Sequence, residues 1–84
     1  MDINIEPTDL DKRLEEAAKD RHPAVKDVCQ FFRGAHLDTF QQIIVEGFQE
    51  LILSLLWHLK DCPQLTHALN DLLHAKDAAV RASL

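Results

Sequence analysis

The chain has 84 residues, of which 46% are hydrophobic and 27% are charged, so it is neither disordered nor fibrous. Nine Lys and Arg stand against 14 Asp and Glu, and the net charge of −5 disfavours binding to duplex nucleic acid or to an anionic membrane. The scarcity of Gly and the excess of Leu and Ala over β-branched residues favour helices over sheets. We therefore expect one all-α domain over residues 1–84. A chain of this length buries only about 60–65% of its unfolded surface, so we also expect self-association.

The beginning of the sequence, MDINIEPTDLDKR, is acidic and lacks an apolar run, so it predicts no secretory signal. The longest apolar stretch, Leu51 to Trp57, is too short to span a bilayer. Cys29 and Cys62 lie far apart without a CxxC pair, which predicts two free thiols in a reducing cytoplasm.

Residues 1–21 are expected to form an N-terminal helical extension. Residues 1–7 read as an extended lead-in, and Thr8 is placed to cap a helix that runs from Asp9 to about Asp20. This helix has one narrow apolar stripe, so we expect it to dock on a core rather than to build one. The stripe consists of Leu10, Leu14, Ala17 and Ala18.

A second helix is predicted from Pro23 to Phe32, because Pro suits a first helical turn. Gly34 is expected to end it. Its inward face is expected to comprise Val25, Val28, Cys29 and Phe32.

The strongest helical pattern covers residues 38–59, where Asp38 or Thr39 could cap. Apolar residues go almost all the way round its C-terminal half, more than a small monomer can cover, which indicates a protein–protein interface. Helical spacing predicts one packed face, made of Phe40, Ile44, Phe48, Leu51, Leu55 and Leu59. A second apolar stripe lies beside it and comprises Ile43, Val45, Ile52, Leu53, Leu56 and Trp57.

A last helix is predicted from Pro63 to near Leu84, after the turn at residues 60–63. A short connection between two long helices predicts an antiparallel hairpin, through which the chain would oligomerise. The alanines of the last helix keep it slim, so that other helices can approach. Six residues are expected to point inward: Leu65, Leu69, Leu72, Leu73, Val80 and Leu84.

The case for catalysis is poor. His67, Asp71 and His74 share one helical face and, with His58, could bind zinc, but three polar residues on a solvated face are the more common situation. Cys29 lies on an apolar face, where a buried inert thiol is more common than a nucleophile. Two glycines cannot build a phosphate-binding loop. We therefore expect no enzyme, no metal and no cofactor.

Lys76, Asp77 and Arg81 gather near the end of the last helix. Asp77 and Arg81 are four residues apart and could form an ordinary surface ion pair. The alternative is an anion clamp in which the carboxylate orients the guanidinium. The charges alone favour the ordinary surface ion pair, because such pairs are common.

Several segments resemble small phage proteins of the anti-CBASS and Thoeris anti-defence hairpin family. They are HPAV at 22–25, AHL at 35–37, the spacing of Gln42, Phe48 and Leu51, and above all LTHALNDLLHAKDAAVRASL at 65–84. The resemblance covers roughly residues 22–84, and LLHAKDAAVRA is its most specific part. Residues 1–21 are not covered.

This resemblance implies a non-enzymatic protein of the host cytoplasm that binds and sequesters cyclic oligonucleotide or cyclic ADP-ribose immune signals. It implies a helical hairpin that forms homo-oligomers, from dimers to hexamers, with ligands between protomers. The alternative is a small helical protein–protein interaction module without a nucleotide ligand. The ligand-binding candidates that the motif implies are Lys76, Asp77 and Arg81, with Thr66 and His36 as weaker ones.

A nucleotide base needs an aromatic or guanidinium surface for stacking. The chain has no Tyr. The remaining candidates are Phe31, Phe32, Trp57 and Arg33.

Overall fold

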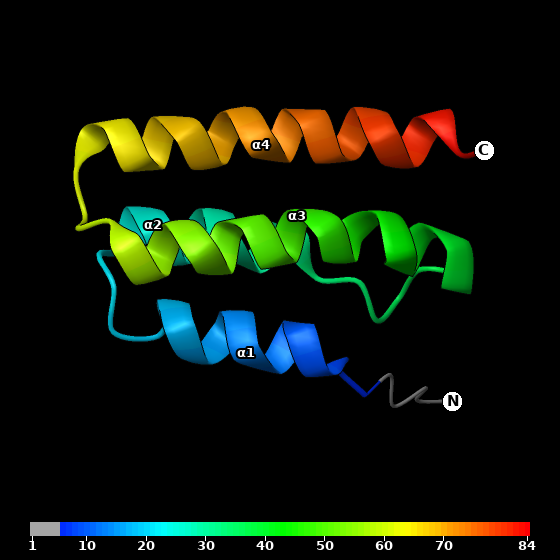
Figure 1. Ribbon diagram of the computed structural model, residues 1–84, viewed down its shortest axis with the longest axis horizontal. Coiled ribbons are helices and arrows are strands. Elements are labelled where there is room, and N and C mark those ends of the chain that lie inside the picture. The colour runs from blue at the N-terminus through cyan, green and yellow to red at the C-terminus, as the bar shows by residue number, and fades with distance from the viewer. Residues whose placement is uncertain (1–5) are drawn as a thin grey trace.

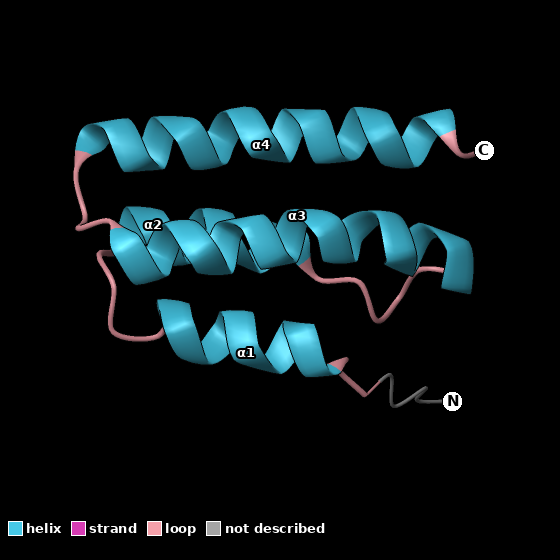
Figure 2. Ribbon diagram, viewed as in Figure 1, coloured by secondary structure: helices cyan, strands magenta, loops and turns pink. Residues whose placement is uncertain are grey.

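The computed structural model describes residues 6–84, and in this part of the chain all regular elements are helices, joined by short loops (Figures 1 and 2). The prediction of an all-α fold is confirmed. The extended lead-in predicted for residues 1–7 falls mostly on residues 1–5, which lie outside the described part. The elements are α1 (Asp9–Ala18), α2 (Pro23–Cys29), the 3₁₀ turn η1 (Gln30–Phe32), α3 (Thr39–His58) and α4 (Pro63–Ala82).

The helices begin where the sequence indicates. Thr8 caps α1: its hydroxyl oxygen accepts a hydrogen bond from the Asp11 amide at 3.0 Å, and the Thr8 amide donates back to the Asp11 carboxylate at 3.2 Å. Asp38 caps α3 by accepting a bond from the Gln41 amide. His22 caps α2 through Nδ1, which accepts a bond from the Ala24 amide.

The end of the second predicted helix differs from the prediction. The α-helical part stops at Cys29, and residues 30–32 tighten into a 3₁₀ turn, as helix ends often do. Arg33 is extended, with φ −68° and ψ 142°, and it terminates the helix. Gly34 follows but does not adopt a left-handed conformation, so it is not the expected glycine cap.

The four α-helices surround one core. α3 contacts α1 on one side and α4 on the other, while α2 contacts both α1 and α4. α3 and α4 lie side by side and run in opposite directions, joined by a short connection (Figure 1). None of the helices within residues 6–84 combines the length and the apolar character needed to cross a membrane. The buried core consists of Leu14, Ala18, Val25, Val28, Cys29, Phe32, Ile52, Leu56, Leu65 and Leu69.

The packed face predicted for α3 is largely wrong, because only Phe48 and Leu55 of its six residues pack against the core, and neither is fully buried. Val45, Gln49, Ile52 and Leu56 form the buried stripe instead. The predicted residues form a stripe that is exposed or half-buried, and we call it the α3 apolar stripe: Phe40, Ile44, Phe48, Leu51, Leu55 and Leu59. Val45, Ile52 and Leu56 belong to the second apolar stripe of the pattern, which the fully buried polar residue Gln49 interrupts and so makes less conspicuous.

The inward face predicted for α4 is confirmed in its first half. Leu65 and Leu69 are buried, and Leu72, Leu73 and Val80 are half-buried. Leu84 was expected to point inward as well, but it lies beyond the end of α4 and is 89% exposed.

Candidate ligand-binding site

Four of the predicted ligand-binding residues line one shallow hollow. His36 comes from the turn before α3, whereas Lys76, Asp77 and Arg81 come from the second half of α4. The hollow has a volume of about 240 Å³. We call it the α4 hollow, and its lining is His36, Leu37, Lys76, Asp77, Val80 and Arg81.

Thr66, the fifth candidate, does not lie there. It lines a larger groove between α2 and α4, with a volume of about 520 Å³. His22, His67 and Asn70 line the same groove over an apolar floor that includes Val25. The predicted set is therefore divided between two separate places.

Lys76 is largely committed to contacts within the chain. Its side chain is only 12% exposed, and its Nζ lies 2.8 Å from Oδ1 of Asp77. The same Nζ lies 5.7 Å from the centroid of the Phe32 ring, within the range of a cation–π contact. Phe32 is fully buried and cannot stack on a ligand.

The ion pair in the α4 hollow is not the expected one. Asp77 pairs with its neighbour Lys76, and within residues 6–84 no ion pair joins it to Arg81. Because the charges of Lys76 and Asp77 largely offset each other, the exposed guanidinium of Arg81 is the main positive charge available to an anion.

The turn that carries His36 is held by hydrogen bonds rather than by a regular element. The Leu37 amide donates to the Gly34 carbonyl at 3.0 Å. Nε2 of Gln42, in the first turn of α3, donates to the Leu37 carbonyl at 2.9 Å and to the Ala35 carbonyl at 3.4 Å. These bonds fix one side of the hollow against α3.

Asp11 is a buried carboxylate that the sequence analysis missed. It is only 4% exposed and accepts hydrogen bonds from the amides of Thr8, Gly34 and Ala35 and from the Gln49 side chain. Burial by itself would raise the pKa of Asp11, but these four bonds outweigh burial and lower it. Its capping-box spacing, three residues after Thr8, was the available signal.

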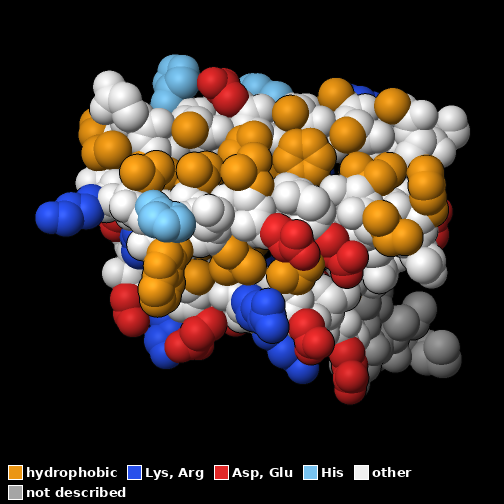
Figure 3. Space-filling view, viewed as in Figure 1, with side chains coloured by type: hydrophobic (Ala, Val, Ile, Leu, Met, Phe, Trp, Pro, Cys, Tyr) orange, Lys and Arg blue, Asp and Glu red, His pale blue; other side chains and the backbone are white. Residues whose placement is uncertain are grey.

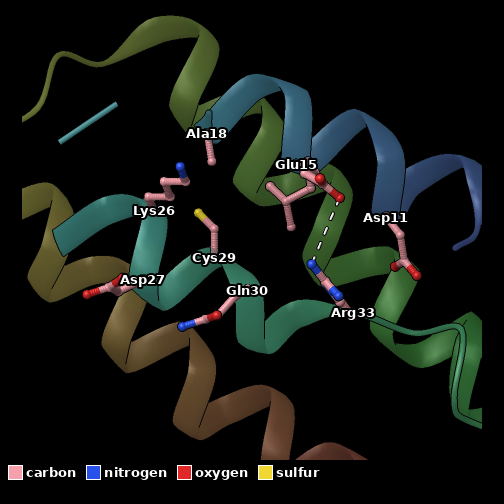
Figure 4. A pocket seen from close by; sticks show the side chains of 9 residues that line it. Asp11, Glu15, Ala18, Lys26, Asp27, Cys29, Gln30 and Arg33 are labelled. Atoms are coloured by element: carbon pink, nitrogen blue, oxygen red, sulfur yellow. Dashed lines mark ion pairs between the residues drawn. The ribbon is translucent and has the colours of Figure 1, made fainter. Parts of the chain in front are cut away.

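A third hollow, about 190 Å³, lies between α1 and α2 (Figure 4). Arg33 and Glu15 face each other across it, 3.9 Å apart. Cys29 is buried at its edge, as predicted, and burial raises the pKa of its thiol to about 11 despite a smaller opposing effect of Arg21. A thiol with this pKa stays protonated at neutral pH and is a poor nucleophile.

The zinc alternative finds no site in the described part of the chain. Within residues 6–84 no three His, Cys, Asp or Glu side chains lie close enough together to hold a metal ion. Nδ1 of His58 instead lies 2.8 Å from the Ser54 carbonyl oxygen.

Three of the four candidate stacking residues are accessible. Phe31 is 56% exposed, Trp57 is 85% exposed, and Arg33 is exposed as well. None of the three lines the α4 hollow.

Comparisons with protein-family profiles, curated proteins and solved structures find no match to this chain.

Proposed function

We propose that this chain is a non-enzymatic binding protein that sequesters a cyclic nucleotide signal of bacterial immunity in the cytoplasm of a phage-infected host. The supporting observation is that His36, 40 residues before Lys76 in the sequence, lines the same hollow as Lys76, Asp77 and Arg81. The resemblance of residues 22–84 to the anti-defence hairpin family supports the same ligand class.

The geometry favours a site that a second copy completes. Pockets for small molecules usually measure about 300–1,000 Å³, and the α4 hollow is smaller and shallow. Each protomer would supply one half-site, with Arg81 as the principal contact to a phosphodiester.

The exposed face of α3 and α4 provides a separate surface for association, because most alanines of α4 project from the side of that helix opposite Asp77 and Arg81. Apolar side chains gather over this pair of helices (Figure 3). The bulky α3 apolar stripe lies beside the small alanines of α4, so a two-fold arrangement could pack large side chains against small ones. Helices of 20 residues are about 30 Å long, and a two-helix face covers on the order of 600 Å², close to the roughly 800 Å² per partner of a stable complex. Helix α4 contains five alanines, Ala68, Ala75, Ala78, Ala79 and Ala82, of which all but Ala78 share one side of the helix.

One observation favours the alternative, an interaction module for another protein. Trp57 is 85% exposed, and single exposed tryptophans are frequent anchors of protein interfaces. Such a module would bind no nucleotide and would use the apolar face for a different chain.

The test is a thermal-shift screen with cyclic di-adenylate, cyclic tri-adenylate and cyclic ADP-ribose, followed by mass spectrometry of the molecule that heating releases. A sequestering protein gains stability at micromolar ligand and releases the ligand intact. Arg81→Ala should weaken binding about ten- to hundred-fold, because a charge-assisted bond is lost. No shift with any of the three would favour the interaction module, and a hydrolysed product would indicate an enzyme.

A further inference from the structure

Helix α1 is fastened to the rest of the molecule by a polar anchor at each end. At its first turn, Asp11 accepts hydrogen bonds from the segment after η1 and from α3. Just beyond its last turn, Arg21 donates to Asp61 and to the carbonyls of Leu56 and Leu59. Only the Asp11 anchor touches residues that lead to the α4 hollow.

The first connection runs through the backbone. Oδ1 of Asp11 accepts a bond from the Gly34 amide at 2.9 Å, and Oδ2 accepts one from the Ala35 amide at 3.2 Å. His36 and Leu37, which line the hollow, come next in the chain. This stretch lacks helical backbone hydrogen bonds. Because the buried Asp11 carboxylate binds two consecutive amides in it, the carboxylate restricts the position of the His36 imidazole.

The second connection runs through Gln49. Its Nε2 donates to Oδ1 of Asp11 at 2.7 Å and to the Phe32 carbonyl at 2.8 Å. The Phe32 ring lies beneath the ammonium of Lys76, and Lys76 lines the α4 side of the hollow. Asp11 therefore supports both walls, the turn with His36 and the α4 side with Lys76.

We infer that Asp11 is a positioning residue for the α4 hollow, through which the N-terminal helix sets the geometry of the ligand-binding side chains. This inference rests on the proposed function of the hollow. It assigns a role to helix α1, which lies outside the segment that resembles the anti-defence family.

The experiment compares the two anchors of the same helix. In Asp11→Ala and Asp11→Asn, hydrogen exchange at the Gly34 and Ala35 amides of the free protein should accelerate about tenfold or more beyond exchange at Leu69, a core amide that reports global unfolding. The His36 imidazole resonances should shift. Affinity for whichever of the three cyclic nucleotides binds the wild type should fall about tenfold, with Asn intermediate because it keeps one acceptor oxygen.

Arg21→Ala is the matched control, since it loosens the other end of α1 and does not touch the turn. It should leave exchange at Gly34 and Ala35, relative to Leu69, and nucleotide affinity within about twofold of wild type. Equal effects of the Asp11 and Arg21 variants would show a merely structural role and overturn the inference. Unchanged exchange in both Asp11 variants would overturn it as well.

A second variant covers the case in which the Asp11 variants fail to fold. Gln42→Met removes the donors to Leu37 and Ala35 but leaves the core untouched, so it should loosen the turn and weaken binding in the same direction. If no nucleotide binds the wild type, the proposed function fails, whereas the exchange and His36 measurements still decide whether Asp11 positions the turn.

Discussion

The guanidinium of Arg21 and the carboxylate of Asp61, 40 residues apart in the sequence, lie 2.6 Å from each other between Nε and Oδ1. The same guanidinium donates to the Leu56 and Leu59 carbonyls at 2.7 Å each, and Oδ2 of Asp61 accepts a bond from the His22 amide. Carbonyls at the end of a helix have no partner within the helix and carry partial negative charge. Arg21 therefore caps α3 and ties the α1–α2 junction to the α3–α4 connection.

Arg21→Ala should lower the melting temperature by about 5 °C or more, because it removes the donor to the two carbonyls and to Oδ1 of Asp61. Arg21→Lys should restore only part of the loss, since one ammonium cannot reproduce the planar set of three donors. Thermal unfolding followed by circular dichroism measures both. A lysine variant as stable as wild type would show that charge alone, and not the geometry of the guanidinium, stabilises this junction.

Stability should fall in acid. Four hydrogen bonds lower the pKa of Asp11 below its ordinary value of 3.8, so its contribution is fully present above that value and disappears as the pH drops through the lowered pKa. The pKa of Asp61 is also lowered, chiefly by the bond from the His22 amide, so its contribution to stability is lost in the same acidic pH range. Asp11→Asn should lose about 1–3 kcal/mol near neutral pH and show a shallower decline below about pH 4. Urea denaturation across this range measures it, and an acid limb as steep as that of wild type would contradict the role given to Asp11.

The two cysteines should react at different rates. Cys62 is exposed and should be labelled by a thiol reagent in native buffer, whereas Cys29 is buried with a raised pKa and should react only after unfolding. Cys62→Ser provides the control, because it should abolish the fast phase alone. Two fast thiols, or a disulfide in protein purified without oxidant, would contradict this assignment.

Association should depend on the exposed face of α3. Light scattering should give the wild type a mass well above the 9.6 kDa of one chain. Leu51→Glu places a charge in the centre of the α3 apolar stripe and should yield monomers. Leu53 is a poorer probe because it packs against the core.

Gln64→Glu is the control for this experiment, since it adds the same charge at an exposed position near the start of α4. It should leave the mass unchanged. A wild type that remains monomeric at micromolar concentration would rule out self-association, and Trp57→Glu tests whether a different part of α3 forms the contact.

The sequence predicted the helices well because their caps and breaks are local. Thr8, His22-Pro23, Asp38 and Pro63 lie at the starts of helices, and side-chain chemistry near each start is sufficient to place it. Which stripe of α3 is buried is not determined by residues that are close in the sequence. It depends on Gln49, whose buried Nε2 donates to Asp11, 38 residues earlier in the sequence.

The arrangement of the candidate site could be predicted only in part, because it too depends on contacts between residues that are distant in the sequence. Helical spacing brought Lys76, Asp77 and Arg81 near one another, but it could not show that Lys76 reaches Asp77 and the Phe32 ring. Nor could it separate Thr66, which lies in a different groove. Both outcomes depend on how α4 packs against η1 and α2.

The contact between Asp11 and Gln49 also restricts how helix α1 can be seated. The apolar stripe of α1 is narrow and, by itself, would tolerate a shift of one helical turn, about 5.4 Å, along α3. Such a shift would place the Asp11 carboxylate among apolar side chains and leave the Gln49 amide without an acceptor, each at a cost of several kcal/mol. Together with the Arg21 anchor at the other end, this polar pair selects one register for a helix whose hydrophobic surface would permit several.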